Sequence, residues 1–65
     1  MNVPKLKGLI AERGYSMREV AAGINMPEKT FYRKMKKGVF GTDEAEALIA
    51  FLQISNPVDI FLQSK

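Results

Sequence analysis

A break at residues 23–25, which read GIN, separates two short helical patterns and constrains the fold more than any other feature of the chain. The pattern before the break opens with a capping box, SMRE, in which the side chains of Ser16 and Glu19 can each accept a hydrogen bond from the other's amide. Asn25 tolerates a left-handed backbone, and Pro27 suits the first turn of a new helix. The sequence therefore predicts two consecutive helices that meet at a tight corner.

Apolar residues at helical spacing continue on both sides of this corner, and no alternating strand pattern or internal repeat is present. A first helix should end at Gly14, Thr42 should cap a fourth helix, and Asn56 should cap a short fifth helix. We therefore expect an all-α fold, a compact bundle of five helices, in which residues 1–65 form a single domain.

A chain of this length must pack its apolar side chains efficiently, because a small domain buries only about 60% of its unfolded surface. It contains no cysteine and no histidine, so we expect no disulfide, no metal site and no cofactor. Phe61 and Leu62 fit either the core or a dimer seam, with the core slightly favoured. The residues expected to face inward are Val20, Ala21, Ile24, Phe31, Met35, Phe40, Ala45, Leu48, Ile49, Leu52, Val58, Phe61 and Leu62.

Composition also argues against several protein classes. The longest apolar cluster, ALIAFLQI, is far shorter than the roughly 20 residues of a membrane-spanning helix. The N-terminus lacks the apolar stretch of a secretory signal, so we expect a soluble, cytoplasmic protein. Catalysis is not expected, because without histidine or cysteine it would depend on carboxylates or lysines. The closest acidic residues, within 43–46, fit a solvated helix start better than a catalytic pair.

Charge is unevenly distributed along the chain, although the net charge is only +3. Residues 1–37 contain nine basic and three acidic side chains, whereas residues 38–65 contain one basic and four acidic side chains. Five of the basic residues fall within 29–37, a stretch without an acidic residue. This asymmetry indicates that one face of the protein binds a polyanion.

The corner and its flanks meet the physical requirements of a helix-turn-helix over about residues 16–37. Ala21 is small enough for two helices to cross closely. Around the second helix, residues 27–37, Phe31 and Met35 share one side while cationic side chains occupy the opposite side. In helix-turn-helix proteins the second helix, the recognition helix, enters the major groove of DNA.

The stretch YSMREVAAGINMPEKTFYRKMKKG, followed by FGTDEAEALIAFLQI, resembles the Cro/cI (XRE-type) helix-turn-helix family. It is particularly similar to the short regulators of temperate phages of Gram-positive bacteria, over about residues 5–62. The resemblance implies a lambda-repressor-like domain that regulates transcription in a bacterial host by binding palindromic double-stranded DNA operators as a homodimer. It implies base contacts by Glu28, Lys29, Tyr32 and Arg33. It implies phosphate contacts by Ser16, Met17, Arg18, Lys36 and Lys37.

Three positions depart from the common pattern of that family. Asn25 stands where many members have glycine, which is a physically mild change. Pro27 stands where serine or threonine often caps the recognition helix, and Met17 stands where a glutamine often contacts phosphate. The departure at Pro27 concerns how the recognition helix enters the groove, and the departure at Met17 concerns how the protein holds the DNA backbone.

Other interpretations of these residues stay open. The cations of residues 29–37 can form a simple solvated face, and Tyr32 fits a packing role as well as a DNA contact. Glu28 fits the positive end of a helix better than a contact to cytosine. The alternative function is a phage modulator that binds a repressor protein through its acidic, apolar C-terminal third. The DNA-binding half of an antitoxin ranks third, because no toxin-neutralising tail is evident.

Overall fold

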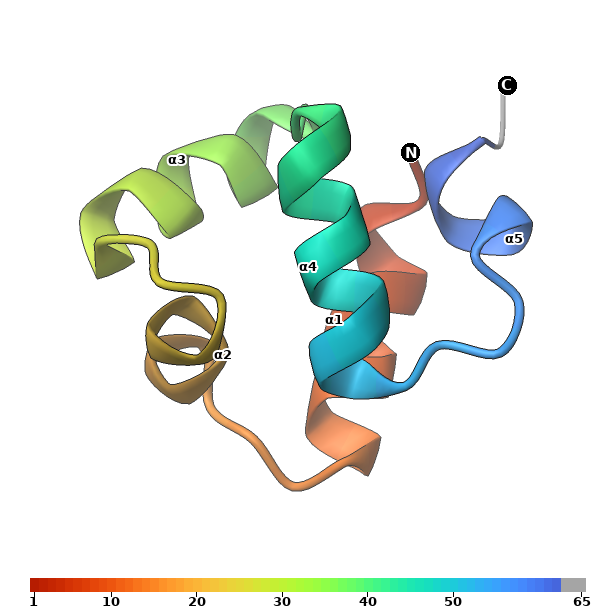
Figure 1. Ribbon diagram of the computed structural model, residues 1–65, viewed down its shortest axis with the longest axis horizontal. Helices are drawn as coiled ribbons and strands as arrows, with labels where there is room; N and C mark the ends of the chain where they lie inside the picture. The colour runs from red at the N-terminus through yellow and green to blue at the C-terminus, as the bar shows by residue number, and fades with distance from the viewer. Residues whose placement is uncertain (63–65) are drawn as a thin grey trace.

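Residues 1–62, which the computed structural model describes, form five consecutive helices and no strand (Figure 1). The helices are α1 (Val3–Glu12), α2 (Met17–Gly23), α3 (Glu28–Lys37), α4 (Thr42–Leu52) and α5 (Val58–Phe61). The predicted all-α, five-helix fold is therefore confirmed for these residues. Among them, no helix combines the length and the apolar character needed to cross a membrane.

One apolar core joins the helices. In Figure 1, α2 and α3 lie on one side of α4, and α5 lies on the other. Helix α2 packs against both α3 and α4, and α1 packs against α5. Phe31 and Met35 of α3 are almost fully buried, as predicted. The buried core residues are Leu6, Ile10, Val20, Ala21, Phe31, Met35, Leu48, Leu52, Ile54 and Ile60.

The corner between α2 and α3 has the geometry that the sequence predicts. Asn25 adopts a left-handed backbone with φ 61°. Its amide donates to the carbonyl of Ala22 at 3.1 Å, and the amide of Met26 donates to the carbonyl of Ala21 at 2.9 Å. These two bonds are the Schellman pattern that satisfies the last carbonyls of a helix. The corner is therefore set by local hydrogen bonds as well as by packing.

Left-handed residues also end three other helices, at Gly14, Gly38 and Gln53. Gln53 was not predicted, because glutamine rarely adopts this conformation. Arg13 supports that end of α4, since its Nε donates to the carbonyl of Leu52 at 3.0 Å and its Nη2 to the carbonyl of Gln53 at 3.3 Å. An arginine from the end of α1 thus caps the end of α4.

Three predicted helix starts need correction by one position. Helix α3 begins at Glu28, with Pro27 as its N-cap rather than its first residue. Helix α4 begins at Thr42, and the cap is Gly41, whose amide donates to a Glu44 carboxylate oxygen at 2.7 Å. Helix α5 begins at Val58 rather than Pro57. Asn56 does not cap it, because the Asn56 side chain donates to the Asp59 carboxylate instead, at 2.7 Å.

The prediction that Val58 faces the core is wrong, and so is the favoured core position of Leu62, whereas the dimer-seam alternative for Leu62 stays a prediction. Their side chains are 56% and 74% exposed, and the buried residue is Ile60. Positions two residues from an inward-facing residue lie about 200° around a helix, so burial of Ile60 turns both neighbours outward. Phe61 and, on α4, Ile49 are half-buried and pack against the core. Ala45 of α4 is half-buried as well.

A close contact between α2 and α4 occurs at Gly23, which belongs to α2 rather than to the break. A Cβ atom at this position would lie 2.3 Å from the Phe51 ring. The Phe51 ring also contacts the Tyr15 ring, with the ring centroids 4.9 Å apart and the ring planes tilted by 37°. Helix α2 can therefore lie this close to α4 because Gly23 has no side chain.

We predict that Gly23→Ala lowers the free energy of unfolding by about 1–3 kcal/mol, because the added methyl group overlaps the Phe51 ring. The matched control is Gly8→Ala in α1, where an added Cβ meets no atom within 4 Å. That change should raise stability by about 0.5–1 kcal/mol, the usual gain from alanine in a helix. Denaturant titration of the two variants measures both values. Equal changes in the free energy of unfolding, of the same sign, in both variants would contradict the close contact between Gly23 and Phe51.

Candidate nucleic-acid interface

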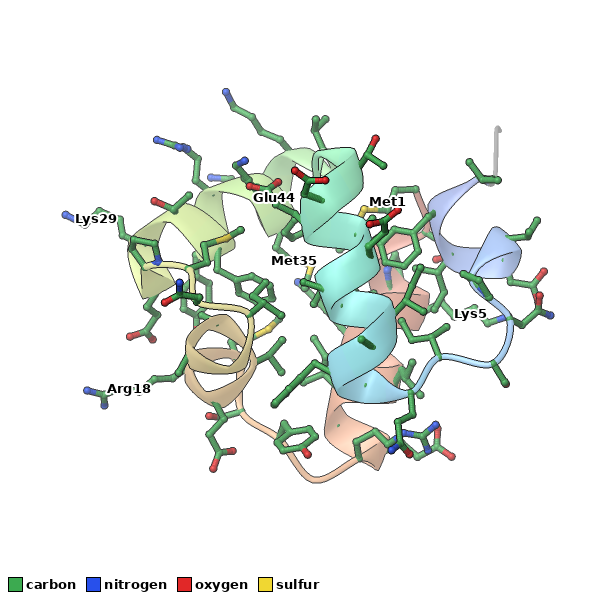
Figure 2. The ribbon with its side chains drawn as sticks, in the orientation of Figure 1. Met1, Lys5, Arg18, Lys29, Met35 and Glu44 are labelled. Atoms are coloured by element: carbon green, nitrogen blue, oxygen red, sulfur yellow. The ribbon has the colours of Figure 1, made fainter. Side chains whose placement is uncertain are left out.

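The outer face of α3 is built by the burial of its inner face. Phe31 is fully buried and Met35 is 2% exposed. Lys29, Arg33 and Lys36 lie opposite these two residues and are consequently exposed. The exposed residues of α3 are Glu28, Lys29, Tyr32, Arg33, Lys36 and Lys37. Figure 2 shows Lys29 projecting away from the body of the protein. We call these six exposed residues the α3 outer face.

Several basic residues of the N-terminal half serve the fold itself. Lys5 of α1 pairs with Asp59 of α5 at 3.2 Å. Lys34 of α3 pairs with Glu44 of α4 at 2.6 Å. The Arg13 guanidinium is bound to backbone carbonyls of α4 and its cap. These three cations therefore link pairs of helices rather than presenting charge to a partner.

A second group of cations lacks such pairing. Within residues 1–62, no carboxylate forms an ion pair with Lys7, Lys29, Arg33, Lys36 or Lys37. Four of these five side chains belong to the α3 outer face, so its positive charge is not neutralised by the described part of the chain. Like charges spaced three or four residues apart on a helix destabilise it, which makes an anionic partner favourable.

Glu44 holds the end of α3 against the start of α4. Its carboxylate accepts a hydrogen bond from Lys34 Nζ and another from the Gly41 amide. The bond from Lys34, followed by the bond from Gly41, lowers the pKa of Glu44 below its ordinary value. Since the pKa is lower in the folded chain than in the unfolded chain, this stabilisation is complete above the unfolded-state pKa and is lost as the pH falls through the folded-state pKa.

We predict that Glu44→Gln lowers the free energy of unfolding by about 0.5–1 kcal/mol near neutral pH, because the ion pair with Lys34 is lost. The difference from the parent chain should shrink as the pH falls into the range where Glu44 itself is protonated. Urea titrations across the acidic pH range measure it. A difference that is independent of pH would contradict the role assigned to the carboxylate charge.

The start of α2 lies beside α3 and contains the predicted phosphate-contacting residues. The capping box is confirmed, since Glu19 N donates to Ser16 Oγ at 3.1 Å and Ser16 N donates to Glu19 Oε1 at 2.8 Å. The Ser16 hydroxyl proton is therefore the group that can still be donated outward. Arg18 is exposed and points outward on the same side of the view as Lys29 (Figure 2).

Glu28 lies close to Arg18, with a carboxylate oxygen 3.9 Å from Arg18 Nε. The Arg18 side chain is 83% exposed, so this ion pair contributes little to stability. Glu28 is also the first residue of α3, where a carboxylate favours the positive end of the helix. Both features agree with the interpretation of Glu28 as a helix-start residue, and the base contact stays a prediction.

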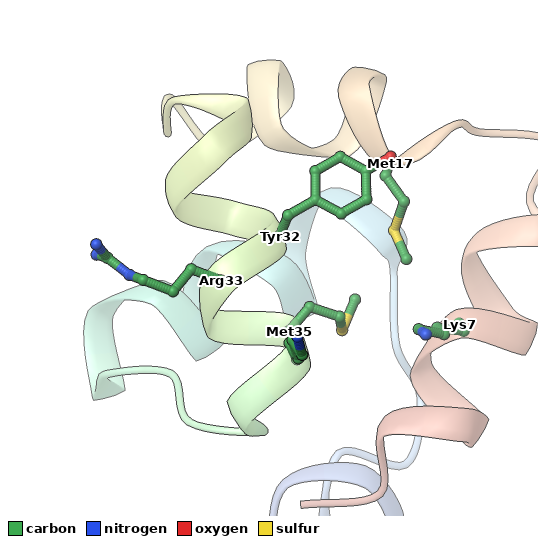
Figure 3. Close-up of a pocket in the computed structure, with 6 residues that line it drawn as sticks. Lys7, Met17, Tyr32, Arg33 and Met35 are labelled. Carbon is green, nitrogen blue, oxygen red and sulfur yellow. The ribbon is translucent and has the colours of Figure 1, made fainter.

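A groove of about 500 Å³ runs beside α3 and was not predicted. Its lining includes Tyr32 and Lys36 of the α3 outer face and the half-buried Met17 of α2. Lys7 of α1 completes one wall (Figure 3). The sequence alone does not predict which of Lys5 and Lys7 lines the groove, because both are lysines on the same helix. The packing of α1 decides which of them reaches it.

The predicted site residues are thus brought onto adjoining surfaces. Those predicted to contact bases lie on the α3 outer face, and those predicted to contact phosphates lie at the start of α2 and the end of α3. Tyr32 is 49% exposed, so the packing and DNA-contact interpretations both stay open. The described residues include no group of three or more carboxylate, histidine or cysteine side chains placed to hold a metal ion.

Comparison with known proteins adds no identification. No family model matches the chain, and neither curated proteins nor solved structures give a match.

Proposed function

We propose that this chain is a sequence-specific DNA-binding transcriptional regulator of the phage Cro or repressor kind, acting in the cytoplasm of a bacterial host. The observation that carries the proposal is the α3 outer face, which exposes four cations without ion-pair partners among residues 1–62. DNA phosphates would relieve the repulsion among these charges and release counterions. A tight α2–α3 corner, supported by hydrogen bonds, leaves that face accessible.

In this proposal α3 is the recognition helix and lies in the major groove. Arg33 and Lys29 contact guanine O6 and N7, the acceptors that these side chains bind most often. Lys36 and Lys37 hold phosphates beyond one end of the helix, and Arg18 holds a phosphate from α2. Bound at a promoter, the protein excludes polymerase or a competing repressor from the same DNA.

Two copies would occupy a two-fold operator. Half-sites one helical turn apart are separated by about 34 Å. The chain extends 27 × 22 × 19 Å along its principal axes, so two copies fit side by side at that separation. A single α3 offers few base contacts, and a second copy doubles them.

Selection of bound sites from random duplex DNA tests the proposal, and we expect a palindromic consensus. On the selected site, Arg33→Ala should weaken binding by about 1–3 kcal/mol and relax one position of the consensus. Lys37→Ala should weaken binding to the selected site and to random DNA alike, because phosphates carry no sequence information. Electrophoretic mobility shifts measure both variants. Equal losses on both DNAs for both variants would contradict this division of roles.

A protein partner is the second candidate function, and a separate surface favours it. Val39 and Leu62 are 64% and 74% exposed. Both line a groove of about 350 Å³ that also includes Met1, Phe40 and Phe61. A modulator that binds a repressor protein could use this apolar surface without using the α3 outer face.

A salt titration separates the two candidates. If phosphates are the partner, the logarithm of the binding constant should fall with the logarithm of the salt concentration, with a slope of about −0.9 for each phosphate neutralised. The three phosphate contacts assigned to Arg18, Lys36 and Lys37 would give a slope of about −2.7. Binding through Val39 and Leu62 should be nearly independent of salt. Binding of duplex DNA with a slope near zero would argue against the proposed interface.

A further inference from the structure

The groove beside α3 joins a residue of α1 to the surface of the recognition helix. Figure 3 shows Lys7 on α1 facing Met17 and Met35 across the groove. Arg33 of α3 also lines the groove, with its side chain extending away from Lys7 in this view. Lys36 also lines the groove, from α3. Cations from two different helices therefore border one apolar hollow.

The chemistry of the lining is mixed. Met17, Met35 and Tyr32 supply apolar surface, and the positive charge comes from Lys7, Arg33 and Lys36. A ligand that suits this lining alternates apolar and anionic groups. The sugar–phosphate backbone of DNA does so, since each deoxyribose presents carbon atoms between two phosphates. Methionine adapts its shape to irregular apolar surfaces, and lysine binds phosphate as a point charge.

We propose that one strand of bound DNA lies along this groove, with Lys7 and Lys36 on phosphates and Met17 against the intervening deoxyribose. The proposal rests on the proposed function and adds a contact from α1 to it. It also assigns a different role to Met17, whose thioether is too weak a hydrogen-bonding group to replace a glutamine on a phosphate. In this site Met17 makes an apolar contact.

A comparison with Lys5 explains why Lys7 can bind a phosphate. The two residues are separated by about 200° around α1. Lys5 pairs with Asp59 of α5, whereas no carboxylate in residues 1–62 pairs with Lys7. One lysine of α1 thus stabilises the fold, and the other faces the groove. Lys5 is the matched control for Lys7, with the same charge on the same helix.

The experiment compares Lys7→Ala, Lys7→Arg and Lys5→Ala for binding to random duplex DNA across a range of salt concentrations. We expect Lys7→Ala to weaken binding severalfold and to reduce the magnitude of the salt slope by about one, as for loss of a single phosphate contact. Lys7→Arg should keep the slope of the parent chain, and so should Lys5→Ala. Thermal unfolding of Lys7→Ala should match the parent, because Lys7 is exposed.

The outcomes distinguish the two proposals. If Lys36→Ala reduces the slope and Lys7→Ala does not, the α1 contact is refuted while DNA binding by α3 stands. If the parent chain binds no duplex in a salt-dependent way, the proposed function itself fails. Equal slope changes in Lys7→Ala and Lys5→Ala would also refute the groove, because they would reflect net charge alone.

A second arm tests the apolar contact. Met17→Leu should bind DNA like the parent, whereas Met17→Ala should bind severalfold more weakly with an unchanged salt slope, since no charge is removed. Circular dichroism reports whether each variant is folded. A folded Met17→Ala that binds DNA like the parent would refute the contact between Met17 and the deoxyribose.

Discussion

Burial of Phe31 and Met35 is the constraint on which the proposed interface depends. The Phe31 ring is fully buried and lies 5.6 Å from the Phe40 ring, centroid to centroid. Burial of one such side chain contributes about 1.5–3 kcal/mol, whereas an exposed ion pair contributes about 0–1 kcal/mol. The core therefore decides how α3 is rotated, and its charges follow. Residues 29, 33 and 36 face outward because residues 31 and 35 must face inward.

The fold uses some of its cations internally and leaves others exposed. Lys34 lies on the margin of the core, where α4 offers Glu44 as a partner. The Arg13 guanidinium likewise donates its hydrogen bonds to the carbonyls at the end of α4. The cations that remain exposed are concentrated on the α3 outer face, although the net charge of the chain is small. Concentration of charge, rather than its total, is what attracts a polyanion.

The surfaces proposed for the two candidate partners are made of different residues. Helix α3 and the start of α2 carry the cations, and α5 lies on the far side of α4 from α2 (Figure 1). The exposed Leu62 directly follows α5, and Val39 follows α3. The apolar surface that a repressor protein could bind is therefore made of residues other than those of the α3 outer face.

The sequence by itself determined the helices, the capping box, the left-handed Asn25 and the two-sided character of α3, because each depends on residues within about one or two turns of one another. Local hydrogen bonds and helical periodicity suffice for such features. Tertiary structure alone decided that Phe51 covers Gly23, that Arg13 caps α4, and that Lys7 rather than Lys5 borders the groove. These contacts join segments that are remote in the chain, and their partners depend on how whole helices pack, which no local pattern encodes.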